Sequence, residues 1–268
     1  MTANPRKVAF VLAATDQGTF LVNRFDHHTD NQRTYGVGEM LLQFASRDQR
    51  EIDIIAALLN LRREYFGAGV VAIDCGANIG IHTVSLARQM TGWGDVVAFE
   101  AQERLFYALC GNVTLNNVFN ARAFHVAVAG EVGRMRIPVL DHASPASFGS
   151  LELKPASKEA IGQSVDYSEK AGMEVHTITL DSLGLARVDF IKIDVEGMEM
   201  EVLKGARNIL ADLKPIVFLE WAKSNLAALS DYLNGFGYVI FEAGINLFAV
   251  HQSDKSIAYL TERVATKP

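Results

Sequence analysis

A glycine-containing turn follows a strongly apolar stretch near the middle of the N-terminal half of the chain. The apolar stretch ends at Asp74, and Gly76 and Gly80 follow in the pattern Asp-x-Gly-x-x-x-Gly. Open parallel sheets bind ligands where a strand passes into a helix at such a turn. Gly76 would let the backbone approach a ligand, and Gly80 would let the next helix pack close to the strand. The turn, including Ala77 and Asn78, is therefore predicted to bind a cofactor.

This turn differs from the Gly-x-Gly-x-x-Gly fingerprint of dinucleotide-binding proteins. The middle glycine is missing, and Asn78 stands near the expected start of the helix. A pyrophosphate needs open backbone N–H groups at a helix N-terminus. S-adenosylmethionine has no phosphate, and its ammonium group would suit the carboxylate of Asp74. The turn therefore favours S-adenosylmethionine over a dinucleotide.

An acidic residue ends the next apolar stretch. Glu100 directly follows the apolar residues 96–99, and Ala101 comes after it. A carboxylate about 20 residues beyond such a turn can accept hydrogen bonds from ribose hydroxyls. The alternative is a solvated acidic residue at a strand end, but the position after a buried run favours the binding role. Glu100 and Ala101 are therefore predicted to belong to the cofactor site.

A third acidic group lies at the end of the strand expected at residues 188–194. It consists of Asp194 and Glu196, with Gly197 directly after them. We expect Asp194 to contact the cofactor and to reach the cleft where the methyl group would lie. The alternative is that one of the two carboxylates caps the following helix.

A hydroxyl group that accepts a methyl group must also lose its proton, so the site needs a base. The candidates share a place near the expected cleft: Asp194, His82, Glu196 and Glu220. Asp194 is favoured as the group nearest the acceptor, whereas His82 could instead be a packing or capping residue. The oxygens of Asp194, Glu196 and Glu220 could hold Mg²⁺, but no spacing in the sequence demands it. The predicted site therefore contains no metal.

The elements that must position these residues alternate between strands and helices from Gly69 onward. The expected strands of the sheet span residues 70–74, 95–100, 121–128, 188–194, 216–220, 238–242 and 245–250. Continuous apolar strands separated by helices indicate a parallel sheet covered on both faces. The last two strands flank Ala243 and Gly244 and should form an antiparallel hairpin. The pattern predicts an α/β, Rossmann-like, seven-stranded class I methyltransferase sheet with helices on both faces.

Two further segments lie outside this alternation. Residues 1–68 form an expected N-terminal extension, with a hairpin around residues 16–18 and the amphipathic helix Gln49–Phe66. The extension could close the cleft as a lid through Arg33, Tyr35 and residues 36–38, or its helix could simply cover a sheet edge. Residues 69–268 form the expected cofactor-binding domain. An insert near 135–172 is either a substrate loop or lid, or a long surface connection.

Composition limits the partners. The net charge is −6 and no Lys/Arg cluster is present, which disfavours a nucleic-acid substrate and favours a small-molecule or glycan acceptor. The apolar run at 8–14 is too short for a secretory or membrane-spanning segment, so a cytoplasmic location without membrane contact is expected. Cys75 and Cys110 form neither a disulfide framework nor a zinc site. The sequence does not indicate the oligomeric state.

The chain resembles the FkbM family of S-adenosylmethionine-dependent methyltransferases. The motifs that carry the resemblance lie at 74–80, 99–101, 179–183, 191–199 and 203–206, within about 69–250. The resemblance implies O-methylation of a hydroxyl group on a small molecule, sugar or natural product. Family members often carry Ser-Asp just after the third strand, where this chain has Ala129, Gly130 and Glu131. Backbone N–H groups are therefore expected to contact the adenine.

Two other functions share parts of this pattern. An NAD(P)-dependent oxidoreductase would also carry an acidic residue after the second strand, but it needs the glycine spacing that is missing here. A non-catalytic cofactor-binding module could have the same fold, since fold does not determine function. Asp74, Glu100 and Asp194 favour an enzyme over this module.

Overall fold

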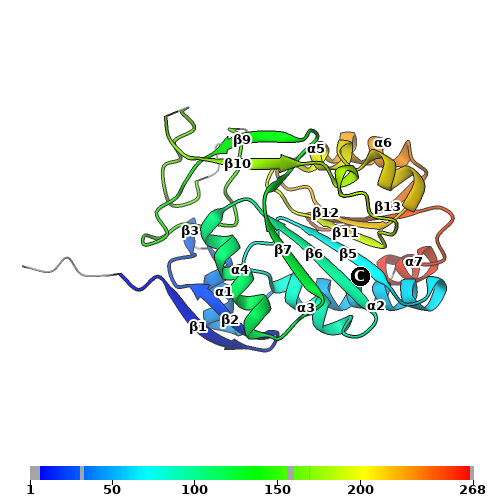
Figure 1. Cartoon of the computed structure of the whole chain (residues 1–268), viewed down its shortest axis with the longest axis horizontal. Coiled ribbons are helices and arrows are strands. Elements are labelled where there is room, and N and C mark those ends of the chain that lie inside the picture. The colour runs from blue at the N-terminus through cyan, green and yellow to red at the C-terminus, as the bar shows by residue number, and fades with distance from the viewer. Residues whose placement is uncertain (1–6, 31–32, 156–159, 169, 266–268) are drawn as a thin grey trace, which may run out of the picture.

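The computed structural model describes residues 7–30, 33–155, 160–168 and 170–265. Its centre is a seven-stranded sheet in the order β13-β14-β12-β11-β5-β6-β7 (Figure 1). The strands are β5 (Val70–Cys75), β6 (Gly94–Glu100), β7 (Ala121–His125), β11 (Phe190–Ile193), β12 (Ile216–Glu220), β13 (Tyr238–Ala243) and β14 (Asn246–His251). β14 runs antiparallel to both of its neighbours, and all other strand pairs of this sheet are parallel. The predicted seven-stranded class I methyltransferase sheet is confirmed.

Helices cover both faces of this sheet, as predicted. One apolar core contains buried residues of α2 (Gln49–Phe66), α3 (Ile81–Gln89) and α4 (Glu103–Leu115). The other contains residues of α5 (Glu199–Lys204) and α6 (Leu226–Asn234). Phe190 of β11 belongs to the first core, whereas its neighbour Ile191 belongs to the second, because successive strand residues point to opposite faces. A run of apolar residues without alternation is therefore what a strand between two helical layers requires.

The strand predicted at 121–128 is divided in the structure. β7 ends at His125, and β8 (Ala127–Val128) instead joins β10 (Met173–Ile178) and β9 (Gly133–Ile137) in a separate three-stranded sheet. The part of the insert described between β9 and β10 contains no helix or strand. It nevertheless buries apolar side chains, including Phe148 and Leu151, so it is a packed loop rather than only a surface connection.

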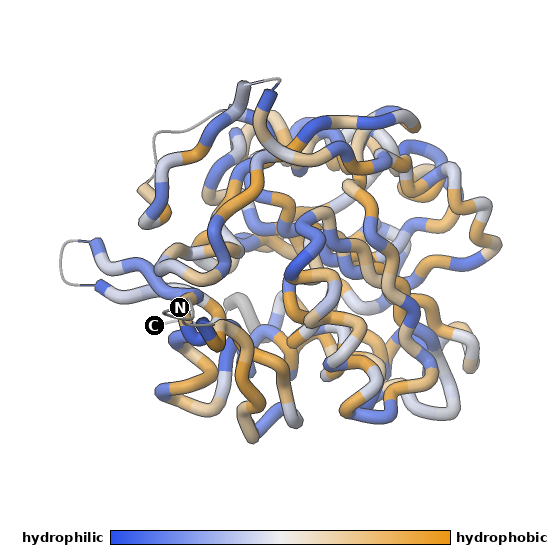
Figure 2. The backbone as a smooth tube through the Cα atoms, turned by 60° about the vertical axis from the view of Figure 1, so that its left-hand side comes forward, coloured by the Kyte–Doolittle hydropathy of each residue, from blue (hydrophilic) through white to orange (hydrophobic). Residues whose placement is uncertain are grey.

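The N-terminal extension contains more structure than expected. Its hairpin, β1 (Phe10–Thr15) and β2 (Gly18–Asn23), is confirmed, and β2 packs against α4, where Leu21 lies against Gly111. A second hairpin, β3 (His28–Asp30) and β4 (Arg33–Tyr35), and helix α1 (Val37–Phe44) were not predicted. Figure 2 shows the second hairpin as a hydrophilic pair of strands that projects from the body of the molecule.

Helix α2 lies over the centre of the sheet and not over its edge. It contacts α3 and the central strand β5, which corrects the alternative that it covers a sheet edge. Helix α7 (Ile257–Ala265), also not predicted, packs beside β13. Among the described residues, the helices include none with the length and hydrophobicity that a bilayer crossing needs.

Candidate functional site

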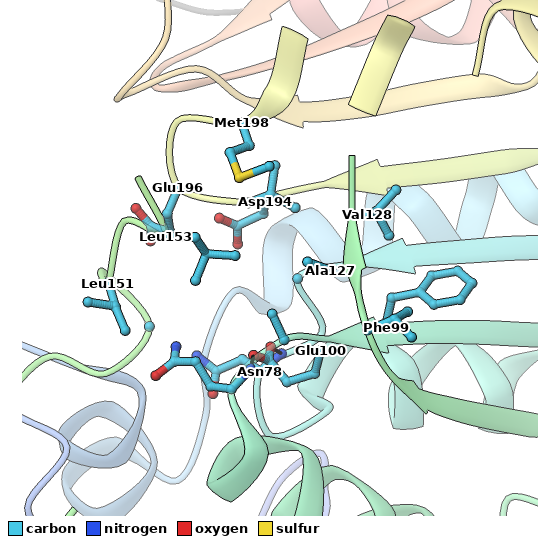
Figure 3. Close-up of a pocket in the computed structure, with 16 residues that line it drawn as sticks. Asn78, Phe99, Glu100, Ala127, Val128, Leu151, Leu153, Asp194, Glu196 and Met198 are labelled. Carbon is cyan, nitrogen blue, oxygen red and sulfur yellow. Dashed lines mark hydrogen bonds between the residues drawn. The ribbon is translucent and has the colours of Figure 1, made fainter. Parts of the chain in front are cut away.

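A cavity lies beyond the carboxyl ends of β5, β6 and β11, where the order of the parallel strands reverses. Figure 3 shows Asp194 and Glu196 on one side of it and Asn78 and Glu100 on the other. We call it the glycine-turn cavity. Its lining residues are Gly76, Asn78, Phe99, Glu100, Ala101, Gln102, Val126, Ala127, Val128, Gly149, Leu151, Leu153, Asp194, Val195, Glu196 and Met198.

The glycines of the turn serve contacts within the protein. Gly76 has a φ of 75°, and a Cβ atom there would lie 1.8 Å from the carbonyl oxygen of Asp194. Gly80 has a φ of 90°, and its Cβ would lie 2.5 Å from Leu109 Cδ1 of α4. The sequence interpretation attributed these glycines to ligand approach and to packing of the next helix on its own strand. In the structure, Gly76 allows the end of β11 to approach the turn, and Gly80 allows α4 to approach it.

The amide groups of the turn are also used internally. The N–H groups of Gly76 and Ala77 donate to the carbonyl oxygen of Phe99 at 3.0 and 2.9 Å. The Asn78 N–H donates to Glu100 Oε2 at 2.8 Å. These donors are therefore engaged by the protein, which leaves no cluster of open N–H groups in the turn for a pyrophosphate.

Glu100 sits at the end of β6 with both carboxylate oxygens bound. Besides the bond from Asn78, its Oε1 accepts a hydrogen bond from the Gln102 N–H at 2.7 Å. The side chain is 5% exposed, and burial raises its pKa to about 7 despite these two bonds. Since a carboxylate oxygen can accept more than one hydrogen bond, Glu100 retains acceptor sites toward the cavity. The neighbouring Ala101 lines the same wall.

Asp74 does not lie where the sequence interpretation expected it. It is fully buried and lines neither this cavity nor its neighbour described below. Thr83 Oγ1 donates to its Oδ2 at 2.6 Å, and Lys192 Nζ lies 3.4 Å from its Oδ1. The predicted direct contact with an ammonium group is therefore replaced by a contact with Lys192.

Lys192 is the central basic residue of the site, and the sequence interpretation missed it. It is buried within β11, with its Nζ 3.2 Å from Asp194 Oδ2 and 3.3 Å from the carbonyl oxygen of Gly76. Burial acts to lower the pKa of Lys192, but the carboxylates of Asp194 and Asp74 outweigh it and raise the pKa. The available signal was a lysine inside an otherwise apolar strand, because a buried lysine requires a charged partner.

Three of the predicted acidic residues do come together. One carboxylate oxygen each from Asp194, Glu196 and Glu220 lies within 4.8 Å of the others. Burial, followed by the neighbouring charge of Asp194, raises the pKa of Glu196 to about 7 and that of Glu220 to about 8. Lys223 Nζ lies 2.8 Å from Glu196 Oε2. The group therefore combines carboxylates with raised pKa values and two lysines.

The turn that carries Asp194 and Glu196 is held by a further carboxylate. Glu199 Oε1 accepts hydrogen bonds from the N–H groups of Val195 and Gly197 at 3.3 and 3.0 Å. Its Oε2 accepts a hydrogen bond from Ser224. Glu199 thus holds this turn. The N-cap position of α5 is Met198, with no side-chain cap hydrogen bond, so neither Asp194 nor Glu196 caps the helix as the alternative had it.

A second cavity, which we call the acidic cavity, adjoins the first. It encloses about 190 Å³ and shares Gly76, Asn78, Gly149, Asp194 and Glu196 with the glycine-turn cavity. Its other lining residues are Tyr35, Gly36, Val37, Arg47, Asp48, Ala77, Ile79, Ile81, His82, Ser147, Ser150, Lys192, Glu220 and Ile245. The extension, the insert and the sheet therefore all contribute walls to it.

Only some of the predicted lid residues line the acidic cavity. Tyr35 and Gly36 line the acidic cavity, whereas Arg33 is exposed and does not. The arginine that does line it is Arg47, which the sequence interpretation missed. Gln17 Oε1 of the first hairpin accepts a hydrogen bond from the Arg47 N–H at 3.1 Å. The extension therefore holds a positive charge at the cavity wall.

The segment after the third strand also differs from expectation. The Ala129 N–H donates to the Ile178 carbonyl oxygen at 2.8 Å, because β8 pairs with β10. That amide is therefore engaged by the protein. Val126, Ala127 and Val128 line the cavity in its place, and they offer an apolar wall.

Two curated proteins are similar to this chain in sequence. Methyltransferase 1 of Beauveria bassiana (strain ARSEF 2860) is 28% identical over 183 residues, which cover 63% of this chain and 72% of the relative. Methyltransferase sdnD of Sordaria araneosa is 26% identical over 154 residues, which cover 50% of this chain and 59% of the relative.

A solved structure, methyltransferase FkbM from Methylobacillus flagellatus KT, matches with 18% identity and a TM-score of 0.48. The match covers 70% of this chain but only 47% of that chain, so this chain spans less than half of its length. Residues 74–240, more than half of the chain and the part that carries both acidic strand ends, match the family described as "Methyltransferase FkbM domain". The chain therefore belongs to the FkbM methyltransferase family.

Proposed function

We propose that this methyltransferase uses S-adenosylmethionine to methylate a hydroxyl group on a small molecule, sugar or natural product. The observation that carries the proposal is the charge of the glycine-turn cavity. Its described lining includes the carboxylates of Glu100, Asp194 and Glu196 and no Lys, Arg or His. A sulfonium cation with an adjacent ammonium group suits this lining, whereas the pyrophosphate of NAD(P) would face carboxylates in a cavity whose described lining has no cationic side chain.

The lining residues fit the parts of this cofactor. Glu100 has acceptor sites for the ribose hydroxyls, and the apolar wall of Val126, Ala127 and Val128 suits the adenine. Asp194 and Glu196 offer negative charge to the amino-acid end and the sulfur. When bound, the cofactor supplies a methyl group on positively charged sulfur.

The acceptor would occupy the acidic cavity, which meets the cofactor cavity at Asp194 and Glu196. Proximity and orientation supply much of the rate in such a transfer. Glu220 is the best-placed proton acceptor in this proposal, because its raised pKa of about 8 brings it close to working pH. Asp194 is held by Lys192 and would orient the acceptor hydroxyl, and His82 is a second candidate base. Since Lys192 and Lys223 already place positive charge beside the carboxylates, the proposal requires no Mg²⁺.

Calorimetry and product analysis test the proposal. We expect S-adenosylmethionine to bind and NADH not to bind, and Glu100→Gln to weaken cofactor binding at least about tenfold. Glu220→Gln should retain cofactor binding but transfer methyl groups more slowly, and Asp194→Asn should transfer them more slowly even when the cofactor is saturating. Mass spectrometry of a cell extract incubated with enzyme and cofactor should show a product heavier by one methylene unit.

Three outcomes would count against it. Binding of NADH without S-adenosylmethionine would indicate an oxidoreductase. Cofactor binding with no methylated product would indicate a non-catalytic module. A product methylated on nitrogen or carbon would overturn the assignment to oxygen.

A further inference from the structure

A second cluster of potential metal ligands lies beside the acidic cavity, and two of its members, Asp48 and His82, line that cavity. It combines Asp48 and Glu51, at the start of α2, with His82, in the first turn of α3. One ligand atom from each residue lies within 4.8 Å of the others. This cluster is distinct from Asp194, Glu196 and Glu220, and its carboxylates come from the N-terminal extension.

The histidine supplies a separate observation that points to a ligand. His82 lines the acidic cavity, and its side chain is buried with an overall exposure of 8%. Its Nε2 atom is buried and makes no hydrogen bond with any described residue. Buried polar atoms in native proteins nearly always have a partner, so an unpaired ring nitrogen on a residue that lines a cavity calls for one. Burial lowers the pKa of His82, which keeps the imidazole neutral and able to coordinate.

The two carboxylates have coordination capacity to spare. Arg47 Nε donates to Asp48 Oδ2 at 2.9 Å, and Asn246 Nδ2 donates to Glu51 Oε1 at 2.8 Å. Neither carboxylate has another hydrogen bond among the described residues, so one oxygen of each remains open. Burial, and next the charge of Asp48, raise the pKa of Glu51 to about 7, although Lys192 and Arg47 act to lower it.

The backbone supports the same conclusion. Asp48 adopts a left-handed conformation, with a φ of 54°, which is uncommon for residues other than glycine. The side chain of Gln17 binds the backbone of Arg47, which precedes Asp48. Gln17 Oε1 accepts a hydrogen bond from the Arg47 N–H, and Gln17 Nε2 donates one to the Arg47 carbonyl oxygen. The chain therefore fixes Asp48 at the cavity wall in a strained conformation, as binding residues often are.

We propose that Asp48, Glu51 and His82 bind a first-row divalent transition-metal ion of the Mn²⁺ or Zn²⁺ type. One imidazole with two carboxylates suits these ions, whereas Mg²⁺ and Ca²⁺ prefer oxygen ligands alone. The ion would join helix α2 of the extension to helix α3 after the glycine turn. Three protein ligands leave open coordination positions, which here would be available to an oxygen-bearing acceptor in the acidic cavity. The metal binding itself does not depend on the proposed methyl transfer.

The test uses the full chain without S-adenosylmethionine, after treatment with a chelator and gel filtration. Titration with Mn²⁺, followed by electron paramagnetic resonance of the free ion, should reveal one tight site per chain. Electron spin-echo modulation should detect a coupled nitrogen from the imidazole. His82→Gln should remove the nitrogen signal and weaken Mn²⁺ binding at least about tenfold.

The matched control is Glu220→Gln, which neutralises a carboxylate in the same cavity but in the other cluster. It should leave the Mn²⁺ affinity and the nitrogen signal unchanged. The proposal is overturned if the wild-type chain binds no Mn²⁺, if bound Mn²⁺ shows no nitrogen coupling, or if Glu220→Gln abolishes binding that His82→Gln retains. Should His82→Gln fail to fold by circular dichroism, the nitrogen coupling of the wild-type chain decides the matter.

Discussion

The charge balance of the site rests on one buried residue. Lys192 lies between Asp74 and Asp194, at 3.4 and 3.2 Å from their oxygens. A buried ion pair contributes little net stability compared with apolar residues of equal volume, but removing one partner leaves an uncompensated buried charge. Lys192 therefore positions Asp194 and pairs with Asp74 beneath the glycine turn.

Replacing Lys192 with methionine keeps most of its length but removes its charge. We expect Lys192→Met to lower the free energy of unfolding at pH 8 by about 3–5 kcal/mol, because two carboxylates then face each other without a cation. Urea unfolding measures this change. The double variant Asp74→Asn with Lys192→Met should be more stable than Lys192→Met alone. Equal stability of Lys192→Met and the wild-type chain would contradict this role.

Sequence could predict which residues stand at strand ends, but not which way each one faces. Asn78, Glu100, Asp194 and Glu196 follow apolar runs, and all of them line the glycine-turn cavity. Asp74 also ends its run, yet it faces Lys192 beneath the cavity. Its orientation depends on the neighbouring strand β11, which is more than a hundred residues away in the chain, so no local pattern reports it.

At the scale of elements, the central sheet was predictable because strands buried on both faces consist of continuous apolar residues. The division of residues 121–128 into β7 and β8 was not, because no glycine, proline or other turn residue separates the two pieces. The chain changes sheets there only because β10 offers Thr177 and Ile178 as pairing partners. The second hairpin and helix α1 lie between residues 28 and 44, where the sequence pattern predicted neither a strand nor a helix.

The glycine turn allows a test of how closely two elements must approach. Gly76→Ala should displace the end of β11, because its Cβ would lie 1.8 Å from the Asp194 carbonyl oxygen. Gly92→Ala is the matched control, since Gly92 also has a positive φ, 81°, but a Cβ atom there would meet nothing within 4 Å. We expect Gly92→Ala to cost about 1 kcal/mol from backbone strain alone.

Gly76→Ala should cost at least about twice as much and should also weaken cofactor binding, which Gly92→Ala should not. Urea unfolding and calorimetry measure the two effects. Similar losses of stability in the two variants would mean that the contact between β5 and β11 relaxes without cost.

At the scale of the whole molecule, the acidic cavity exists because three distant segments meet. Arg47 comes from the extension, Ser147 from the insert and Glu220 from the sheet. Asp26 joins the first two, because its carboxylate accepts hydrogen bonds from the N–H groups of Gly38 and Phe148, both at 3.0 Å. The sequence predicted each segment separately, but their meeting depends on long-range packing that no motif encodes.

The carboxylates of Glu196 and Glu220 in the acidic cavity should make the stability of the protein fall, and its affinity for a cationic ligand rise, as the pH increases. The pKa values of Glu196 and Glu220 rise from an ordinary 4.5 to about 7 and about 8. In the cofactor-free protein these groups keep protons that the unfolded chain has lost, so stability should fall as pH rises from about 5 to about 8. A bound cation favours the ionised carboxylates, so its binding releases protons and strengthens as pH rises.

S-adenosylmethionine and S-adenosylhomocysteine separate this effect from other contributions, because only the former carries a charge on sulfur. We expect the ratio of their affinities to increase about tenfold in favour of S-adenosylmethionine between pH 6 and pH 8, which corresponds to about 1.4 kcal/mol. Calorimetry at the two pH values measures the ratio. Glu220→Gln should reduce the increase, since one of the two titrating carboxylates is gone. A ratio that stays constant with pH in the wild-type chain would show that the sulfonium lies too far from these carboxylates to affect their ionisation.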